Sequence, residues 1–449
     1  MLTKGSVGNL LNRYRAVLKK CHLINTFGSL AVAAMLVMGT ANGEAFGQPI
    51  GYDVTSPAST GPTVSGTDNS SQADARGINA YTTGEHDIPA TITRAEATAT
   101  GTQRARSFGV LSESDTGAPL TVRLDSLEIS SQATTEDGEG RSFGIYSYDN
   151  STVSIKGGSV ASSAQSNNGG STAYGIFSAE HSAVTSGAAS VTVRSSSNAS
   201  SQVLSYGIWA SDFSTFTVTN PLIAIDVSAT SDGEDSEIFA YGIDAEERST
   251  VSLGNATITV QNKTDHQLDF NTAYGVTLGG DSQFSMRDGS IRVAATDISG
   301  KAFTGDAVGI MTNASGDSYQ ISLGTVDIQA EGESASGLEL AHATMDMAGG
   351  SITAKAHGGQ AQGLNANTET AFTATGDIDF IVRAAADGNA VALHAEGESS
   401  VTAAGGRVMA SSQGGTLQDL RPAAAVRSAK LVEILPSCPR KGWPSAWTP

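Results

Sequence analysis

The sequence predicts an all-β protein, a right-handed parallel β-helix of about eleven turns. Three observations support this fold class. A motif of the form aromatic-glycine-aliphatic recurs along most of the chain. Apolar and polar residues alternate with a period of two inside each copy, as they do in strands with one buried face. Each copy contains about three such runs, which suits one turn of a parallel β-helix.

The motif is clearest at Tyr241-Gly242-Ile243, and the other copies align on its glycine at intervals of 26 to 35 residues. Repeats of this length are typical of solenoids, propellers and arrays. Glycine at this position predicts a tight corner of the coil, where a side chain would clash. The glycines expected there are Gly77, Gly109, Gly144, Gly175, Gly207, Gly242, Gly275, Gly309, Gly337 and Gly363, with Ala392 as the equivalent in the last copy.

Two further positions of the repeat predict columns that run from turn to turn. The aromatic residue before the glycine predicts a stack of rings. Tyr174, Tyr206, Tyr241 and Tyr274 would also suit stacking on sugar rings, but their regular recurrence favours a stack that holds the turns in register. A hydroxyl seven residues after the glycine predicts the second column, with Ser151, Ser182, Ser214, Ser249, Ser282, Thr370 and, after Ala392, Ser399.

Other repeat architectures fit less well. A propeller blade needs four antiparallel strands in roughly 40 or more residues, and these copies are too short. The leucine and asparagine framework of leucine-rich repeats is absent, as is the nonapeptide of calcium-binding β-rolls. A different β-solenoid or a β-roll remains the alternative.

Residues 1–45 are predicted to be an extended signal peptide. A basic lead that includes Lys4, Arg13 and Lys20 precedes an apolar run over residues 27–38, and small residues follow. The run is shorter than the roughly 20 residues that span a bilayer, so export is favoured over a membrane anchor. Residues 46–74 are a low-complexity linker or an N-terminal cap, and residues 75–411 form the β-helix repeats.

The lead segment Asn12-Arg13-Tyr14-Arg15-Ala16-Val17-Leu18-Lys19-Lys20-Cys21 resembles the extended signal region of autotransporters and large exported adhesins of Gram-negative bacteria. It departs from that family in lacking a tryptophan and in having a shorter apolar stretch. Together with the repeats, it makes residues 1–411 similar to an autotransporter passenger domain. The resemblance implies a secreted or cell-surface adhesin, associated with virulence, that passes through outer-membrane translocation machinery. It also implies a receptor or glycan on a host or neighbouring cell as partner.

Residues 412–449 do not continue the repeat. This non-repeat tail contains five prolines, two tryptophans and more basic than acidic residues. A passenger is normally followed by a translocator barrel of alternating strands, and no such strands follow residue 411. The sequence therefore predicts a truncation or frame shift near residue 412, and a non-functional truncated passenger is one alternative.

Charge and cysteine content exclude several classes of function. Residues 46–411 contain 16 Lys and Arg against 42 Asp and Glu, a net charge of −26. Such a field disfavours nucleic acid and anionic lipid as ligands. The acidic runs at 136–139 and 232–237 do not recur and lack EF-hand spacing, so solvated loops are predicted there. Both cysteines, Cys21 and Cys438, lie outside the repeats, which excludes an internal disulfide in that region.

The sequence nominates no catalytic, cofactor-binding or metal site, and we expect no enzyme. Polysaccharide lyases and hydrolases also use parallel β-helices, which is the second alternative; Asp377, Asp379 and Arg383, or Asp288 and Arg292, would be the side chains to consider. The seven histidines are scattered without metal-ligand spacing. No nucleophile elbow is present.

Overall fold

A computed structural model describes residues 49–422, except 56–60, 115, 221, 267, 269, 299–302, 314–316, 386–387, 413–416 and 419–420. The predicted signal peptide, both cysteines and most of the tail lie outside these residues. Every regular element in the described part of the chain is a β-strand. The all-β prediction is therefore confirmed.

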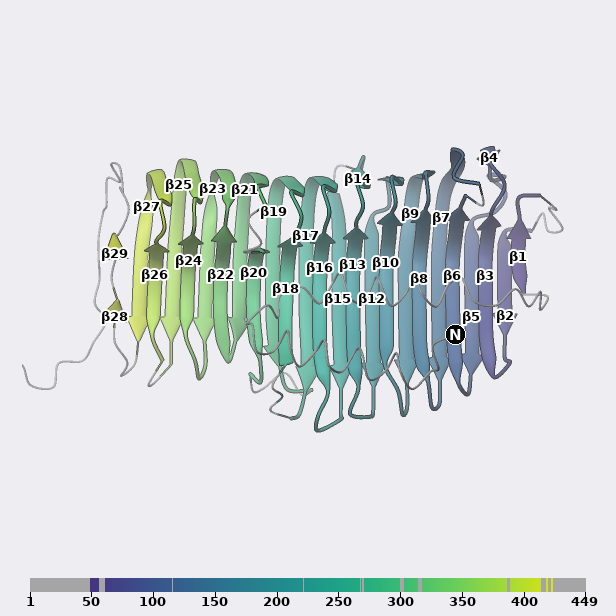
Figure 1. Ribbon diagram of the computed structural model, residues 1–449, viewed down its shortest axis with the longest axis horizontal. Coiled ribbons are helices and arrows are strands. Elements are labelled where there is room, and N and C mark those ends of the chain that lie inside the picture. The colour runs from purple at the N-terminus through teal and green to yellow at the C-terminus, as the bar shows by residue number, and fades with distance from the viewer. Residues whose placement is uncertain are drawn as a thin grey trace, which may run out of the picture. The chain divides into compact units, whose positions relative to one another are not determined.

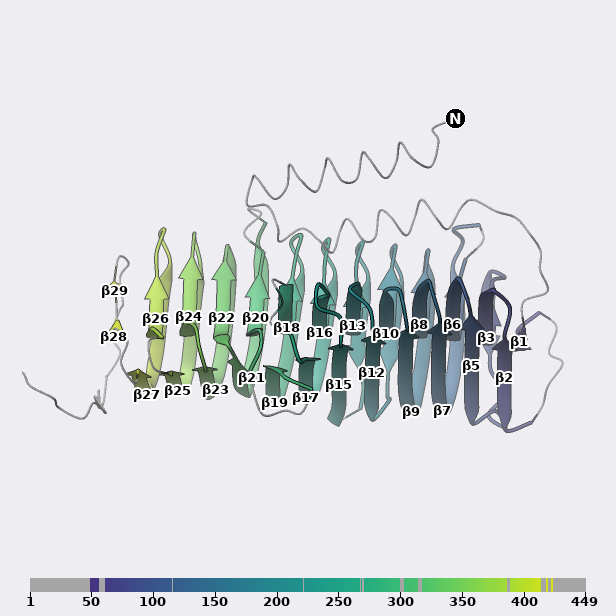
Figure 2. The same ribbon diagram turned by 90° about the horizontal axis from the view of Figure 1, so that it is seen from below.

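The strands form two parallel sheets, and the turns follow one another in chain order through the stack, as the colours of Figure 1 show. We call them sheet 1 and sheet 2. Sheet 1 contains the strands that carry the repeated glycine motif, and Figure 2 shows its strands in one row along the stack, beside the row of the sheet 2 strands. Its members are β1 (Ile50–Asp53), β3 (Gln72–Ala80), β6 (Arg104–Glu113), β8 (Glu139–Tyr148), β10 (Ser171–Ala179), β13 (Gln202–Ala210), β16 (Glu237–Ala245), β18 (Phe270–Leu278), β20 (Asp306–Thr312), β22 (Ser334–Ala341), β24 (Ala361–Asn367), β26 (Ala390–Ala395), β28 (Leu417–Gln418) and β29 (Arg421–Pro422).

Sheet 2 contains the strands that complete each turn. Its members are β2 (Thr63–Asp68), β4 (Gly84–Asp87), β5 (Arg94–Gly101), β7 (Leu120–Thr135), β9 (Ser151–Ser166), β11 (Ala183–Ser186), β12 (Ser190–Ser197), β14 (Thr215–Val218), β15 (Leu222–Ser231), β17 (Thr250–Thr264), β19 (Gln283–Thr296), β21 (Tyr319–Gly332), β23 (Ala343–Ala356), β25 (Ala371–Ala384) and β27 (Ser400–Ser412).

Equivalent residues of successive turns pair directly. Tyr206 is opposite Tyr241 and Tyr241 is opposite Tyr274 in sheet 1. Ile258 pairs with Ile291 in the same way in sheet 2. Parallel strands stacked in this register are a β-solenoid of about eleven turns, which confirms the predicted architecture. The right-handed sense of the coil stays a prediction.

The number of strands per turn differs from the prediction of about three. In most turns the predicted middle and closing strands are one long strand, as in β17. Its buried positions are Val251 and Leu253, then Ala256 and Ile258, so the alternation shifts by one residue between Leu253 and Ala256. The two predicted runs are therefore real but separated by a bend, and hydrogen bonding to the adjacent turns continues through it.

Four glycines at this bend adopt positive φ, a conformation that side chains other than glycine rarely tolerate. They are Gly158, Gly289, Gly350 and Gly406, with φ between 106° and 133°. These glycines lie in the long strands of sheet 2 and are not the glycines of the repeated motif, for which the sequence predicted a corner.

The motif glycines lie inside the strands of sheet 1 and not at a corner, which corrects the prediction. Gly207 has no positive φ. It is needed because a Cβ there would lie 2.4 Å from the carbonyl oxygen of Gly242 in the next turn and 2.6 Å from Ile225 Cγ2 in sheet 2. The same two kinds of contact, with the next glycine carbonyl and a branched side chain of sheet 2, recur at Gly109, Gly144, Gly175, Gly242, Gly275, Gly309 and Gly337.

The interior is a continuous apolar column between the sheets. Residues such as Ile208, Ile225 and Val227 are buried in a single cluster that runs from Tyr52 to Val401. Each turn leaves its apolar edge open until the next turn covers it, so the stability of each turn depends on its neighbours.

Gly207→Ala should test the close packing of the sheets. The new Cβ would clash with the carbonyl oxygen of Gly242 and with the buried side chain of Ile225. We therefore expect a loss of about 3 kcal/mol in the free energy of unfolding, the upper range for an overpacked core. Gly254→Ala is the matched control, since its nearest neighbour would be Asn220 O at 3.4 Å. Urea unfolding followed by circular dichroism measures both, and equal effects would contradict the packing explanation.

Candidate functional site: the turn edge

The short turns that lead from sheet 1 to sheet 2 form one edge of the solenoid, which we call the turn edge. Most of these turns contain two consecutive residues with positive φ. This conformation costs roughly 1 to 2 kcal/mol for a residue other than glycine. The pairs are Asp149 and Asn150, Glu180 and His181, Asp212 and Phe213, Glu247 and Arg248, Gly280 and Asp281, Thr368 and Glu369, and Gly397 and Glu398.

Hydrogen bonds between turns hold this strained backbone. The amide of His181 donates to Asp212 O at 2.8 Å, and that of Phe213 donates to Glu247 O at 2.9 Å. The amide of His342 donates to Thr368 O at 2.8 Å in the same way. Each turn is therefore fixed by the following one, and side chains at equivalent positions are brought together.

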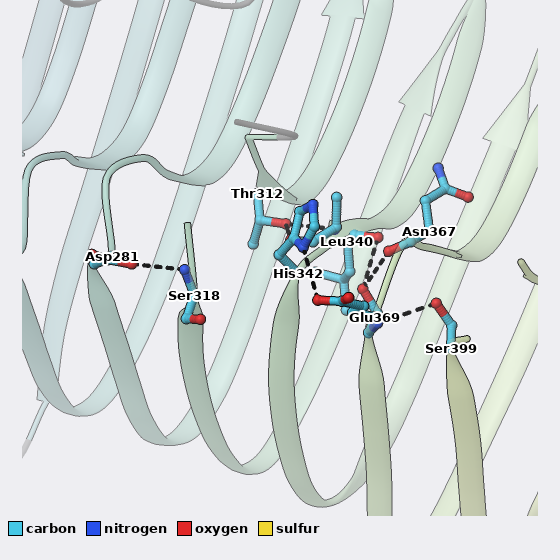
Figure 3. A network of polar contacts seen from close by, with 10 residues as sticks. Asp281, Thr312, Ser318, Leu340, His342, Asn367, Glu369 and Ser399 are labelled. Atoms are coloured by element: carbon cyan, nitrogen blue, oxygen red, sulfur yellow. Dashed lines mark hydrogen bonds and ion pairs between the residues drawn. The ribbon is translucent and has the colours of Figure 1, made fainter. Parts of the chain in front are cut away.

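The predicted hydroxyl column lies just inside this edge and is confirmed. The amide of Ser214 donates to Ser249 Oγ and the amide of Ser249 donates to Ser282 Oγ, both at 3.2 Å. The amide of Thr370 donates to Ser399 Oγ at 3.1 Å, in the region that Figure 3 shows. The hydroxyls thus accept hydrogen bonds from backbone amides that lie outside the regular ladder of the sheet.

Figure 3 also shows polar side chains bridging turns on the outer side of the edge. Asp281 Oδ1 accepts a hydrogen bond from the amide of Ser318 at 2.7 Å. His342 Nδ1 lies 3.6 Å from Glu369 Oε2. These contacts reinforce the stacking in the C-terminal half of the edge.

Carboxyl groups occupy the first positive-φ position in four successive turns: Asp149, Glu180, Asp212 and Glu247. Equivalent positions in neighbouring turns are separated by about 4.8 Å of sheet spacing. Part of the resulting repulsion is relieved because the hydroxyl of Tyr148 donates a hydrogen bond to Glu180. Asp212 accepts a long hydrogen bond from Ser211 Oγ, at 3.4 Å, and its carboxyl group also hydrogen-bonds with that of Glu247.

Two more acids extend this pair into a cluster of four, which we call the carboxyl cluster: Asp212, Asp244, Glu246 and Glu247. Asp244 is 5% exposed and accepts a hydrogen bond from Thr277 Oγ1. Glu246 Oε2 is buried and has no hydrogen-bond partner. The nearest basic side chain along the chain, Arg248, points to Asp281, with 3.6 Å from Arg248 Nε to Asp281 Oδ2.

Three of the carboxyl groups in the cluster, those of Asp244, Glu246 and Glu247, have raised pKa values. A hydrogen bond with the Asp212 carboxyl raises the pKa of Glu247 to about 7, and burial and the charge of Asp212 act in the same direction. Burial raises the pKa of Asp244 to about 6, against the lowering effect of hydrogen bonds from Thr277 and Trp209. Burial, followed by the charges of Asp244, Glu247 and Asp212, raises the pKa of Glu246 well above its usual value.

An exposed aromatic ring lies next to the cluster. Phe213 is 49% exposed and stacks on His181, with 5.2 Å between ring centroids. The guanidinium carbon of Arg248 lies 5.3 Å from the centre of the Phe213 ring. Cationic, aromatic and acidic groups therefore meet on adjacent turns, which is a combination suited to contact with another molecule.

The predicted aromatic column also forms. Phe108, Phe143, Tyr174, Tyr206, Tyr241 and Tyr274 stack in order, with centroids 4.8 to 5.1 Å apart and interplanar angles of 2° to 10°. A second column of Tyr146, Phe177 and Trp209 packs beside it. Inside the column both faces of each ring are covered by neighbouring rings, so the faces are not free to stack on sugars. The geometry favours the interpretation that the column holds the turns in register.

The two sets of acids and bases considered for catalysis lie in different strands, with Asp288 and Arg292 in β19 and Asp377, Asp379 and Arg383 at alternate positions of β25. Asp288 pairs with Thr325, which pairs with Gly349, so the turn of Asp377 lies further along the stack. Asp379 forms an ion pair with Arg407, with 3.2 Å between Oδ2 and Nε. Among the described residues, no group of three or more His, Cys, Asp or Glu side chains is arranged to hold a metal ion.

Sequence reasoning missed the carboxyl cluster and Phe213. The prediction of solvated loops concerned only the acidic runs 136–139 and 232–237, and it did not single out these residues. A usable signal was present, however: Asp149, Glu180, Asp212 and Glu247 all lie five residues after the motif glycine. In a coil with fixed register, equal spacing from the glycine implies stacking.

Comparisons with known proteins identify no relative: no family model, no curated protein and no solved structure matches the chain. In the described part of the chain, no helix has the length and apolar character needed to cross a membrane.

Tyr206→Ala should measure the contribution of the aromatic column. Tyr206 stacks on Tyr174 and Tyr241, each with 4.8 Å between ring centroids. Removing a buried ring costs about 3 to 5 kcal/mol, whereas Tyr206→Phe keeps the stack and should cost about 1 kcal/mol or less. Urea unfolding gives both values; a large loss in the phenylalanine variant would mean that the hydroxyl, not the stacked ring, is important.

The carboxyl cluster should make stability decrease as pH rises. A carboxyl pKa raised in the folded state, compared with about 4 in the unfolded chain, means that the folded state binds more protons between these values. The stabilisation is complete below pH 4 and is lost as pH rises through about 6 to 7. Thermal unfolding at pH 5.0 and 7.5 should therefore give the higher Tm at pH 5.0.

Glu247→Gln should reduce this difference in Tm, because the amide cannot ionise. Glu128→Gln, at an exposed strand position, is the control and should leave the difference as in the native protein. An unchanged pH dependence in Glu247→Gln would show that the carboxyl cluster does not cause it.

Proposed function

We propose that the protein is a secreted or surface-displayed adhesion protein of the autotransporter-passenger type, without catalytic activity. The observation that carries the proposal is an uninterrupted solenoid that presents non-repeating side chains along one edge. The basic and apolar leader of residues 1–45 supports export. In this proposal the solenoid is a stiff scaffold, and contact with a receptor or glycan on a host or neighbouring cell takes place at the turn edge.

The turn edge around Phe213 is the preferred contact surface for two reasons. Phe213, Leu222 and Ile298 are the large apolar side chains most exposed in the described residues, and exposed aromatic residues are enriched at contact hot spots. The neighbouring Glu247 adds negative charge at pH values above its raised pKa of about 7, which would favour a partner with cationic groups.

Expression of the full chain in a Gram-negative host tests export and binding separately. Antibody labelling of intact cells should detect the protein at the surface, and cell extracts show whether it instead stays in the periplasm. Retention in the periplasm would contradict surface display and favour the truncated, non-functional alternative.

Binding of the purified full chain to cultured cells and to a glycan array then tests adhesion. Phe213→Ala should reduce binding about tenfold or more, as expected for an anchor residue. Leu222→Ala is the matched control, because Leu222 is 57% exposed in the same region of the stack but lies away from the carboxyl cluster. Equal losses, or turnover of an acidic polysaccharide by the native chain, would contradict the proposal.

A further inference from the structure

The C-terminal end of the apolar core is incompletely covered. In β25 the core-facing residues Phe372, Phe380 and Val382 are at most 2% exposed. The residues paired with them in β27 are Val401, Val408 and Ala410. Of these, Val401 is 7% exposed, and Val408 and Ala410 are only partly buried. The apolar face of the last complete turn therefore lacks a neighbour in the described part of the chain.

The other end of the core differs. Val64 in β2, the first strand of sheet 2, is 1% exposed, and Tyr52 in β1 is 7% exposed. At this end the core-facing valine of the first strand of sheet 2 is buried, whereas Val408 and Ala410 at the other end are only partly buried. An exposed terminal turn of a solenoid offers both apolar surface and unpaired strand edges, so solenoids require segments that cover it.

The chain turns back toward the open end after β27. The short strands β28 and β29 both pair in parallel with β26, through Leu417 with Ala390 and Arg421 with His394. They occupy the place that the next strand of sheet 1 would take. The first residues of the tail therefore already extend the stack at this end, through two short strands.

We propose that residues 413–449 of the same chain cover the apolar end formed by β26 and β27. The segment contains 37 residues, slightly more than the 26 to 35 residues between motif glycines. It contains five Lys and Arg against two Asp and Glu, opposite in sign to the net −26 of the body. The segment also contains Leu431, Ile434 and Leu435, which would supply apolar side chains for the surface that β27 lacks.

Hydrogen exchange of the full chain tests this covering. Every second amide of β27 points away from β25 and toward the open end. In the double variant Leu431→Asp and Ile434→Asp, exchange in residues 400–412 should become about tenfold faster. Exchange in β2 and β5 at the opposite end should not change. The matched control, Ser428→Asp with Ser437→Asp, adds the same charge at polar positions and should behave as the native chain.

Two results would overturn the proposal. If residues 400–412 exchange equally fast in the native chain and in the Leu431 and Ile434 double variant, the tail does not cover this end. If their protection instead rises with protein concentration, together with the mass measured by light scattering, the covering partner is a second copy of the chain. Both readouts are independent of adhesion, so they do not depend on the proposed function.

Discussion

The in-register pairing of successive turns is the constraint on which the rest of the structure depends. Because each residue lies beside its equivalent in the next turn, every position of the repeat becomes a column of side chains about 4.8 Å apart. The contribution of each column to the structure depends on the type of residue that is repeated in it. Apolar residues give a continuous core, aromatic residues give a ring stack, and hydroxyls give a line of acceptors for backbone amides.

The same constraint makes columns of charge costly. Asp212 and Glu247 are held together by the backbone hydrogen bond between their turns, and the raised pKa of Glu247 is the consequence. Structural columns and the carboxyl cluster thus have one geometric origin. The aromatic column stabilises the folded state. The carboxyl cluster instead disfavours ionisation of its own acids, as their raised pKa values show.

Close approach of the two sheets explains why glycine recurs where it does. At Gly207 and its equivalents, the space for a Cβ is already filled by a carbonyl oxygen of the next turn and a branched side chain of sheet 2. Large side chains in sheet 2, such as Ile225, therefore fit because the glycine opposite them in sheet 1 has no side chain. The repeated motif is a packing device, and the bends are made elsewhere, by Gly158, Gly289, Gly350 and Gly406.

The sequence by itself determined the repeat length, the alternating strands, the solenoid and the aromatic and hydroxyl columns, because each is a local pattern repeated at a fixed interval. Only the tertiary structure decided that the middle and closing runs form one bent strand and that the motif glycines lie inside strands. It alone brought Asp212 against Glu247 and left Val408 partly exposed at the end of the core. These features depend on which side chains meet across turns and between sheets, and on where the stack ends, which no single copy of the repeat encodes.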